Sequence, residues 1–267
     1  MQLPKILDLF AKNRSLILRM SYKDVTDRYA GSALGLFWAL FYPLFLVGIY
    51  AVIFTFIFQI RINQGSTPLE YSLYAIVGLI AWIVMQEGLT KSTSSVTSNT
   101  SLVKQVIFPV NILPVVGILV SFLTLIIGFV FYILVVAIAL PQDLSWIYFL
   151  LPGVILIHFI FSVGLGWLLA SLAVYFRDLK ELVMIVLLVG MFVTPVLYLE
   201  SSIPPAFKWP ILLNPMTHLI NMYRDVLFYG SINHPWSFVI FGSLSLIIFI
   251  FGFYFFEKLK PFFANVL

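Results

Sequence analysis

Apolar residues in this chain come in long runs that are broken by short polar segments. A helix needs about 20 mainly apolar residues to cross the hydrocarbon core of a bilayer, so the stretches between consecutive charges are informative. An even number of such stretches places both chain ends on one side of a membrane. Six stretches predict six spanning helices: 29–59 with an apolar body at 34–58, 71–86, 105–142 with its helix at 114–140, 144–176, 182–199, and 226–256 with its helix from Pro235.

The second stretch is the shortest, because only 16 residues separate Glu70 from Glu87. Glu87 and Lys91 lie one helical turn apart, so they can continue the helix into the membrane interface as a charge pair. We therefore expect this segment to span as well.

Composition excludes a soluble fold of this size. Of the 267 residues, 62% are hydrophobic and 10% are charged, whereas soluble domains carry about 25% charged residues. The predicted fold is an all-α integral membrane protein, with an N-terminal amphipathic interface region (1–33), a six-helix transmembrane domain (34–258) and a short cytoplasmic tail (259–267).

The distribution of basic residues predicts the orientation. The 15 Lys and Arg residues are scattered rather than clustered, which argues against a nucleic-acid partner. With the N-terminus inside, twelve lie on the inner side and three, Arg61, Lys208 and Arg224, on the outer side. The positive-inside rule therefore predicts that both termini are cytoplasmic.

Three segments outside the spans carry further predictions. Residues 3–29 mix apolar and basic positions, which fits one or two amphipathic helices in the inner interface as well as a simple basic anchor. Residues 90–101 hold nine hydroxyl side chains and indicate a polar helix leaving the membrane. The segment 200–236 holds four prolines at 204, 205, 210 and 215, followed by a short apolar stretch, which predicts re-entrant or interfacial helices at the outer mouth.

Catalytic chemistry is largely missing from the sequence. The three histidines, His158, His218 and His234, are far apart and carry no metal-ligand spacing, so we interpret them as structural. There is no Gly-Lys dipeptide and hence no phosphate-binding loop. All eleven acidic residues fall at or beyond span ends, which argues against an ion-coupled carrier. The chain is predicted not to be an enzyme and to hold no metal or cofactor.

Aromatic rings are the notable content of the first span, and Trp38, Phe41 and Phe45 share one helical face. Lipid-facing packing and a passage in which rings meet sugar C–H groups both account for them. Two glycine pairs, Gly31 with Gly35 and Gly164 with Gly166, fit either close helix contact or local flexibility.

Several motifs together resemble a known family. The run RYAGSALGLFW at 28–38, followed by YPL at 42–44, is similar to the opening signature of the permeases of type-2 ATP-binding-cassette exporters. The polysaccharide branch, which exports O-antigen, capsule or teichoic acid, is the best match. Further matches, in the family's order, are KxxxFPxxxxP at 104–114, FRDL at 176–179, TPV at 194–196, NPM at 214–216 and YR at 223–224.

This resemblance implies a homodimeric, multi-pass permease of the bacterial inner membrane. It implies two copies of a separate cytoplasmic ATPase, which binds the ATP and Mg, and a substrate polymer carried on an undecaprenyl-diphosphate lipid. A drug or small-lipid exporter of the same superfamily remains an alternative, and a membrane enzyme is disfavoured because its acidic or histidine cluster is missing.

The resemblance also implies roles for particular residues. The basic residues at the inner entrance could attract the lipid diphosphate. Four sets follow: ATPase coupling by a cytoplasmic coupling helix between the second and third spans, made of Ser101, Leu102, Val103, Lys104, Gln105, Val106, Ile107 and Phe108; the conduit by Trp38, Phe41, Tyr42 and Phe45; the entrance by Arg14, Arg19, Lys23 and Arg28; and the outer gate by Pro195, Pro215, His218, Tyr223 and Arg224.

Overall fold

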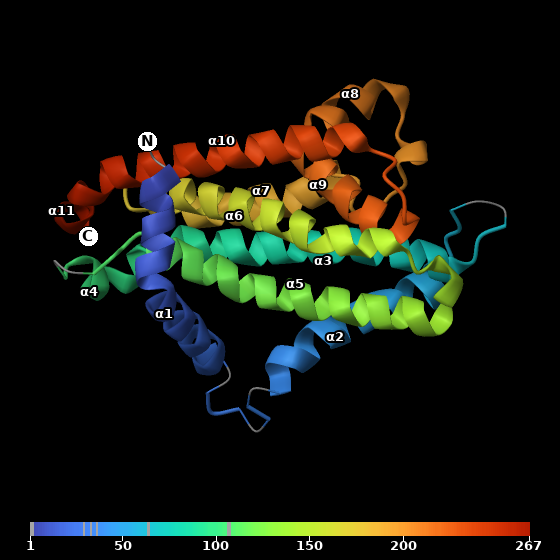
Figure 1. The fold of residues 1–267 in the computed structure, drawn as a ribbon, viewed down its shortest axis with the longest axis horizontal. Helices are drawn as coiled ribbons and strands as arrows, with labels where there is room; N and C mark the ends of the chain where they lie inside the picture. Colours follow the sequence, from blue (N-terminus) through green and yellow to red (C-terminus); the bar gives the residue numbers. More distant parts are fainter. Residues whose placement is uncertain (1–2, 29, 33, 36, 63–64, 106–107) are drawn as a thin grey trace.

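The computed structural model describes residues 3–28, 30–32, 34–35, 37–62, 65–105 and 108–267, and within these ranges it contains helices and no strand. Long helices lie side by side, and both chain ends lie at the same end of the bundle (Figure 1). Following the predicted orientation, we call this end, which carries α1 and α4, the inner end, and the end with α8 and α9 the outer end. The main helices are α1 (Leu3–Arg28), α2 (Phe37–Val52), α3 (Pro68–Ser94), α4 (Thr100–Val103), α5 (Ile112–Ala139), α6 (Leu151–Ala173), α7 (Leu179–Val193), α8 (Pro205–Leu213), α9 (Pro215–Arg224), α10 (Pro235–Leu259) and α11 (Phe263–Val266).

Five helical segments of the described chain are long and apolar enough to cross a membrane: Phe37–Phe58, Pro68–Ser94, Ile112–Ala139, Trp146–Ala173 and Pro235–Val266. They correspond to the first, second, third, fourth and sixth predicted spans. The first includes a π-helical turn, η1 (Ile53–Phe58), that continues α2.

The predicted fifth span, 182–199, has a different form. It forms α7, whose 15 residues are fewer than the about 20 that a helix needs to cross a bilayer. Pro195 was expected inside this span, but it lies two residues past the end of α7. Thr194 takes an extended conformation with ψ of 142°, as expected for a residue before proline.

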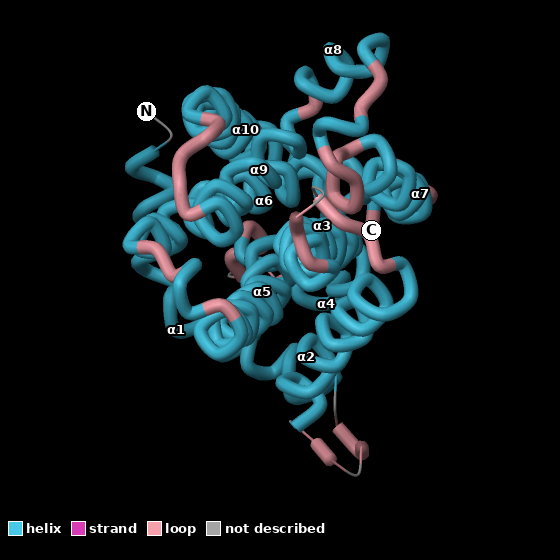
Figure 2. The backbone as a smooth tube through the Cα atoms, turned by 90° about the vertical axis from the view of Figure 1, so that its right-hand side faces the viewer, coloured by secondary structure: helices cyan, strands magenta, loops and turns pink. Residues whose placement is uncertain are grey.

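The helix of the second span, α3, is longer than the apolar run 71–86 from which it was predicted. Its N-terminus is fixed by a capping box, in which the Thr67 hydroxyl accepts from the Glu70 backbone and the Glu70 carboxylate accepts from the Thr67 backbone. The helix continues through Glu87 and Lys91, as predicted, and their side chains are 3.4 Å apart. Seen along the bundle, α3 lies in the middle of the other long helices (Figure 2), which explains why it is buried on nearly all sides.

The closest helix contact joins α6 and α10. A Cβ atom built on Gly252 would lie 2.0 Å from the carbonyl oxygen of Gly164, and a Cβ on Gly164 would lie 2.6 Å from the backbone of Phe249. Gly164 therefore has the first of the two roles that the sequence left open, close helix contact. Gly31 and Gly35 make no such contact with the described residues of the single chain, because both have positive φ and nothing lies within 4 Å of their added Cβ atoms.

The two ends of the chain pack against the bundle. Residues 3–28 form one continuous helix, whose buried Ile6 and Ile17 contact the apolar core. The segment predicted as a tail is also helical, and the ring of Phe263 is fully buried and packs edge-on against Phe256.

Candidate functional site

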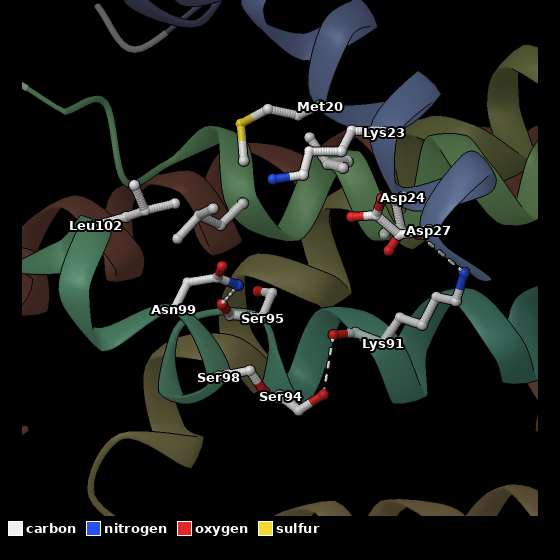
Figure 3. A pocket seen from close by; sticks show the side chains of 13 residues that line it. Met20, Lys23, Asp24, Asp27, Lys91, Ser94, Ser95, Ser98, Asn99 and Leu102 are labelled. Carbon is white, nitrogen blue, oxygen red and sulfur yellow. Dashed lines mark hydrogen bonds and ion pairs between the residues drawn. The ribbon is translucent and has the colours of Figure 1, made fainter. Parts of the chain in front are cut away.

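A polar pocket of about 390 Å³ lies at the inner end, between α1 and the end of α3. Lys23, Asp24 and Asp27 reach it from α1 (Figure 3). Three serines and an asparagine face them from the end of α3 and the segment that follows it. Leu102 of α4 closes one side, so the pocket adjoins the segment that was expected to contact an ATPase. We call it the inner pocket; its polar lining from the α3 side is Lys91, Ser94, Ser95, Ser98 and Asn99.

A chain of ion pairs ties α1 to α3 beside the inner pocket. Arg28 pairs with Glu87, and Lys91 lies 3.2 Å from Asp24 and 3.4 Å from Glu87. Asp24 and Arg28 are four residues apart, as are Glu87 and Lys91, so each helix presents two opposite charges on one face. The four charges alternate in sign across the helix pair, and they add to the apolar packing of Ile17 against Ile112 and Val116 of α5.

The expected coupling segment, Ser101 to Phe108, is less helical than predicted. Within its described residues, only Ser101, Leu102 and Val103 are helical, as part of the single turn α4. Lys104 is a turn residue, Gln105 and Phe108 have no regular structure, and Val106 and Ile107 lie outside the described residues. The side chain of Val103 is buried, whereas Ser101, Lys104 and Gln105 are exposed.

The four cations predicted at the entrance do not form one cluster. At about 100° per helical residue, Arg14 and Arg28 lie on one side of α1, whereas Arg19 lies about 140° and Lys23 about 180° away from Arg14. All four are exposed. Arg28 is engaged by Glu87, and Lys23 reaches the inner pocket (Figure 3), so a single bound diphosphate cannot contact all four from this conformation.

The predicted aromatic face is present on α2. The ring of Phe41 lies 5.5 Å from those of Trp38 and Phe45, measured between centroids. These three side chains and Tyr42 are exposed on the surface of the single chain. The face is therefore available to lipid, to substrate or to a second protein chain.

At the outer end, α9 is buried along its whole length, although half of its residues are polar. Pro215 occupies its first turn, and the Asn214 side chain caps it by accepting from the backbone of Met216. Since buried polar groups need partners, each polar side chain of α9 should be bound to a neighbouring helix.

The predicted gate residues on α9 do have such partners. The hydroxyl of Tyr223 is 3.0 Å from Nδ1 of His158 on α6, and Nδ1 of His218 is 3.0 Å from Oγ of Ser237 on α10. These contacts agree with the structural interpretation of His158 and His218. They hold α9 against both helices.

Arg224 is buried, and its guanidinium lies 3.6 Å above the ring of Tyr74 on α3. Its Nη2 donates to the carbonyl oxygen of Val196 at 2.7 Å, next to Pro195. The structure thus brings two of the predicted gate residues, Pro195 and Arg224, together.

Sequence reasoning missed an acidic and histidine cluster beside Arg224. Asp225 is fully buried, and its carboxylate accepts from both the backbone N–H and Nδ1 of His234 at 2.8 Å. Nε2 of His234 lies 3.5 Å from Glu200. The hydrogen bond to Asp225, followed by the contact with Glu200, raises the pKa of His234 to about 9, and the same contact lowers the pKa of Glu200.

The arrangement of helices defines a polytopic helical membrane protein with a polar pocket at one end and a buried charged cluster at the other. The chain belongs to the ABC-2 type transporter family, whose model matches residues 15–228.

Curated relatives narrow the comparison. The chain is 28% identical over 255 residues to the O-antigen export system permease protein RfbA of Klebsiella pneumoniae, covering 94% of this chain and 95% of the relative. It is 30% identical over 217 residues to RfbA of Myxococcus xanthus, covering 80% and 81%. It is 23% identical over 252 residues to the capsule polysaccharide export inner-membrane protein CtrC of Neisseria meningitidis serogroup B, covering 91% and 90%.

Proposed function

We propose that this chain is the transmembrane subunit of an ATP-driven exporter that moves a lipid-linked polysaccharide of the O-antigen type across the bacterial inner membrane. The observation that carries the proposal is the similarity to O-antigen export permeases over nearly the full length of both chains. Membership of the ABC-2 family supports a separate ATPase partner. Two copies of each subunit, and ATP with Mg on the ATPase, complete the proposed assembly.

The proposed topology has six crossings with both termini in the cytoplasm. The five apolar helices and the position of both chain ends at one end of the bundle support it (Figure 1). In this topology α7, the fifth span in chain order, supplies the one crossing that the five apolar helices leave out, and it becomes long enough when the segment 194–199 beyond it is included.

In the proposed mechanism the ATPase contacts the inner end, and α4 with the exposed residues after it passes the motion to α3 and α5. Lys23 and Arg28 attract the anionic lipid headgroup, with Arg14 and Arg19 as separate contacts along α1. The rings of α2 offer apolar faces to the sugars. ATP shifts the equilibrium between closed and open states through its different affinity for the two.

The proposal is tested by ATP turnover in nanodiscs. We expect no turnover by this chain alone, turnover with its neighbouring ATPase, and stimulation by lipid-linked glycan. Phe108→Asp should lower the stimulated turnover by about tenfold or more, since a buried charge at a protein contact costs several kcal/mol. Tyr22→Asp, at an exposed α1 position of the same end, is the matched control. Stimulation by small amphiphiles but not by glycan would contradict the substrate.

A capsular polysaccharide is the second candidate, because CtrC also matches over most of its length. Comparing stimulation by the two classes of glycan lipid in the same nanodiscs decides between them.

A further inference from the structure

The segment between α7 and η5 (Glu200–Ser202) has no helix; Val196, Leu197 and Leu199 pack against the apolar core, and several other elements make polar contacts with the segment. We call residues 194–199, together with Glu200 at the start of η5, the strap. The Asn214 side chain donates to the Thr194 hydroxyl at 2.8 Å, Arg224 donates to the carbonyl of Val196, and Glu200 lies 3.5 Å from His234. The Tyr71 hydroxyl, on α3, donates to the carbonyl of Leu197.

Gly78 lets the strap approach α3. A Cβ atom on Gly78 would lie 2.9 Å from the carbonyl oxygen of Val196 and 3.3 Å from Nη2 of Arg224. The first of these distances is shorter than real Cβ atoms show, so only glycine at position 78 allows the strap to lie this close to α3. Val196 is completely buried there.

The elements facing the strap are held to the rest of the bundle by hydrogen bonds of their own. The hydroxyls of Tyr132 and Tyr148 both donate to the carbonyl of Leu227, at 3.2 and 3.1 Å. Ser145 donates to the carbonyl of Gly230 at 3.1 Å. With the bond between Tyr223 and His158, these contacts hold α9 and the π-helical turn η6 (Asp225–Tyr229) to α5, to α6 and to the segment 145–148 that precedes α6.

Next to the strap, several buried polar atoms have no partner. Nε and Nη1 of Arg224 and Oδ1 of Asn221 are buried without a hydrogen bond, and so is Oε1 of Glu200. The Glu200 carboxylate is close enough to feel both the Asn221 amide and the Arg224 charge. Unpaired buried donors and acceptors are costly, so a polar ligand that reached these atoms would gain hydrogen bonds that the closed strap does not provide.

We propose that the strap is the moving part of the outer gate, and that Arg224, Asn221 and Glu200 form a binding station for sugar hydroxyl groups that opens when the strap lifts. In the closed state the Val196 carbonyl occupies one guanidinium donor. In the open state a sugar hydroxyl oxygen accepts from the guanidinium in place of the Val196 carbonyl. Sugar hydroxyl groups donate to the side-chain oxygens of Asn221 and Glu200. Sugar hydroxyls fit because each is both donor and acceptor. This inference rests on the proposed export of a polysaccharide.

Motion of the strap is tested with thiol labelling, because the chain has no cysteine. Val196→Cys is compared with Val226→Cys; both valines are fully buried, one on the strap and one on the fixed side. In the complex with the ATPase, a membrane-impermeant maleimide is added from the outer side. We expect labelling of Val196→Cys to rise by about tenfold when ATP is trapped with vanadate, since local opening sets the exposure of a buried group. Val226→Cys should stay protected.

Equal labelling of Val196→Cys with and without trapped ATP overturns the moving strap. This labelling needs no glycan, so a negative result rejects the moving strap without rejecting the proposed export function. Conversely, if glycan lipid never stimulates the complex, the proposed function is rejected regardless of the labelling result.

The binding station is tested in the trapped state with a malto-oligosaccharide on the outer side. We expect the sugar to slow labelling of Val196→Cys severalfold and to lose this effect when Asn221→Leu is added. Unchanged labelling at saturating sugar overturns the station.

A locked strap provides a test within one protein. Thr194→Cys with Asn214→Cys places two thiols where the native side chains are 2.8 Å apart. Oxidation should abolish glycan-stimulated turnover and reduction should restore it, with each single variant as control. Full turnover by the cross-linked protein overturns the proposal.

Discussion

At the scale of residues, the most informative group is His234, whose imidazole bridges two carboxylates. Asp225 belongs to η6 and Glu200 to the strap, so one side chain joins a fixed element to a mobile one. The groups facing the imidazole include these two carboxylates and the ring of Tyr229, at 6.4 Å between centroids, and His218 is also close enough to interact with its charge. The two acidic neighbours favour the imidazolium over the neutral ring.

The raised pKa of His234 makes the outer cluster sensitive to pH. Because the pKa rises from 6.5 to about 9, the stabilisation is complete below pH 6.5 and is lost as the pH increases through 9. His234→Asn keeps an N–H donor for Asp225 but cannot titrate. We expect the melting temperature of the wild type to exceed that of His234→Asn at pH 6.5 and to approach it at pH 10. A difference that does not change with pH would contradict the charged bridge.

At the scale of elements, the contact between α6 and α10 depends on glycine at both sides. Helices in a membrane gain little from burial against each other, so close backbone approach provides much of the attraction. The same helix α10 also carries Gly242, around which nothing lies within 4 Å of an added Cβ.

These two glycines give a matched pair of substitutions. Gly252→Ala would push a methyl group into the Gly164 carbonyl, and we expect a loss of about 1–3 kcal/mol in unfolding free energy. Gly242→Ala should be neutral or stabilising by up to about 1 kcal/mol, because alanine is the better helix former. Unfolding in a mixed detergent series measures both, and equal effects would show that the α6–α10 contact is looser than described.

At the scale of the whole molecule, the rings of α2 and most of α7 are exposed in the single chain. A conduit for a polymer needs walls on all sides, and one copy of this bundle presents the aromatic face only on its surface. We therefore expect two copies to enclose the passage, which is the homodimer of the proposed exporter.

Native mass spectrometry of the complex in nanodiscs measures this directly. The expected composition is two copies of this chain and two of the ATPase, and Trp38→Ala with Phe45→Ala should lower glycan stimulation without changing that composition. Phe149→Ala, at a highly exposed position of the outer end, is the control. A complex with one copy of this chain would contradict the enclosed passage.

The sequence by itself determined the class of protein, because long apolar runs and scarce charges leave only a bilayer as solvent. It also determined the order and approximate bounds of the long helices, the continuation of α3 through Glu87 and Lys91, and the family, since these depend on local pattern. The sequence left Gly164 open between close helix contact and local flexibility, and only the packing of α6 on α10 decided between them.

Only the tertiary structure decided which of those residues work together. Pro195 proved to lie beyond α7, the entrance cations proved to be spread around α1, and Glu200, Arg224 and His234 proved to meet. Their separations in sequence follow no helical period, so no pattern along the chain predicts the contact. It arises because α3, α9 and α10 pack side by side and carry groups from distant segments to one place, where burial makes each unpaired charge or hydrogen bond costly.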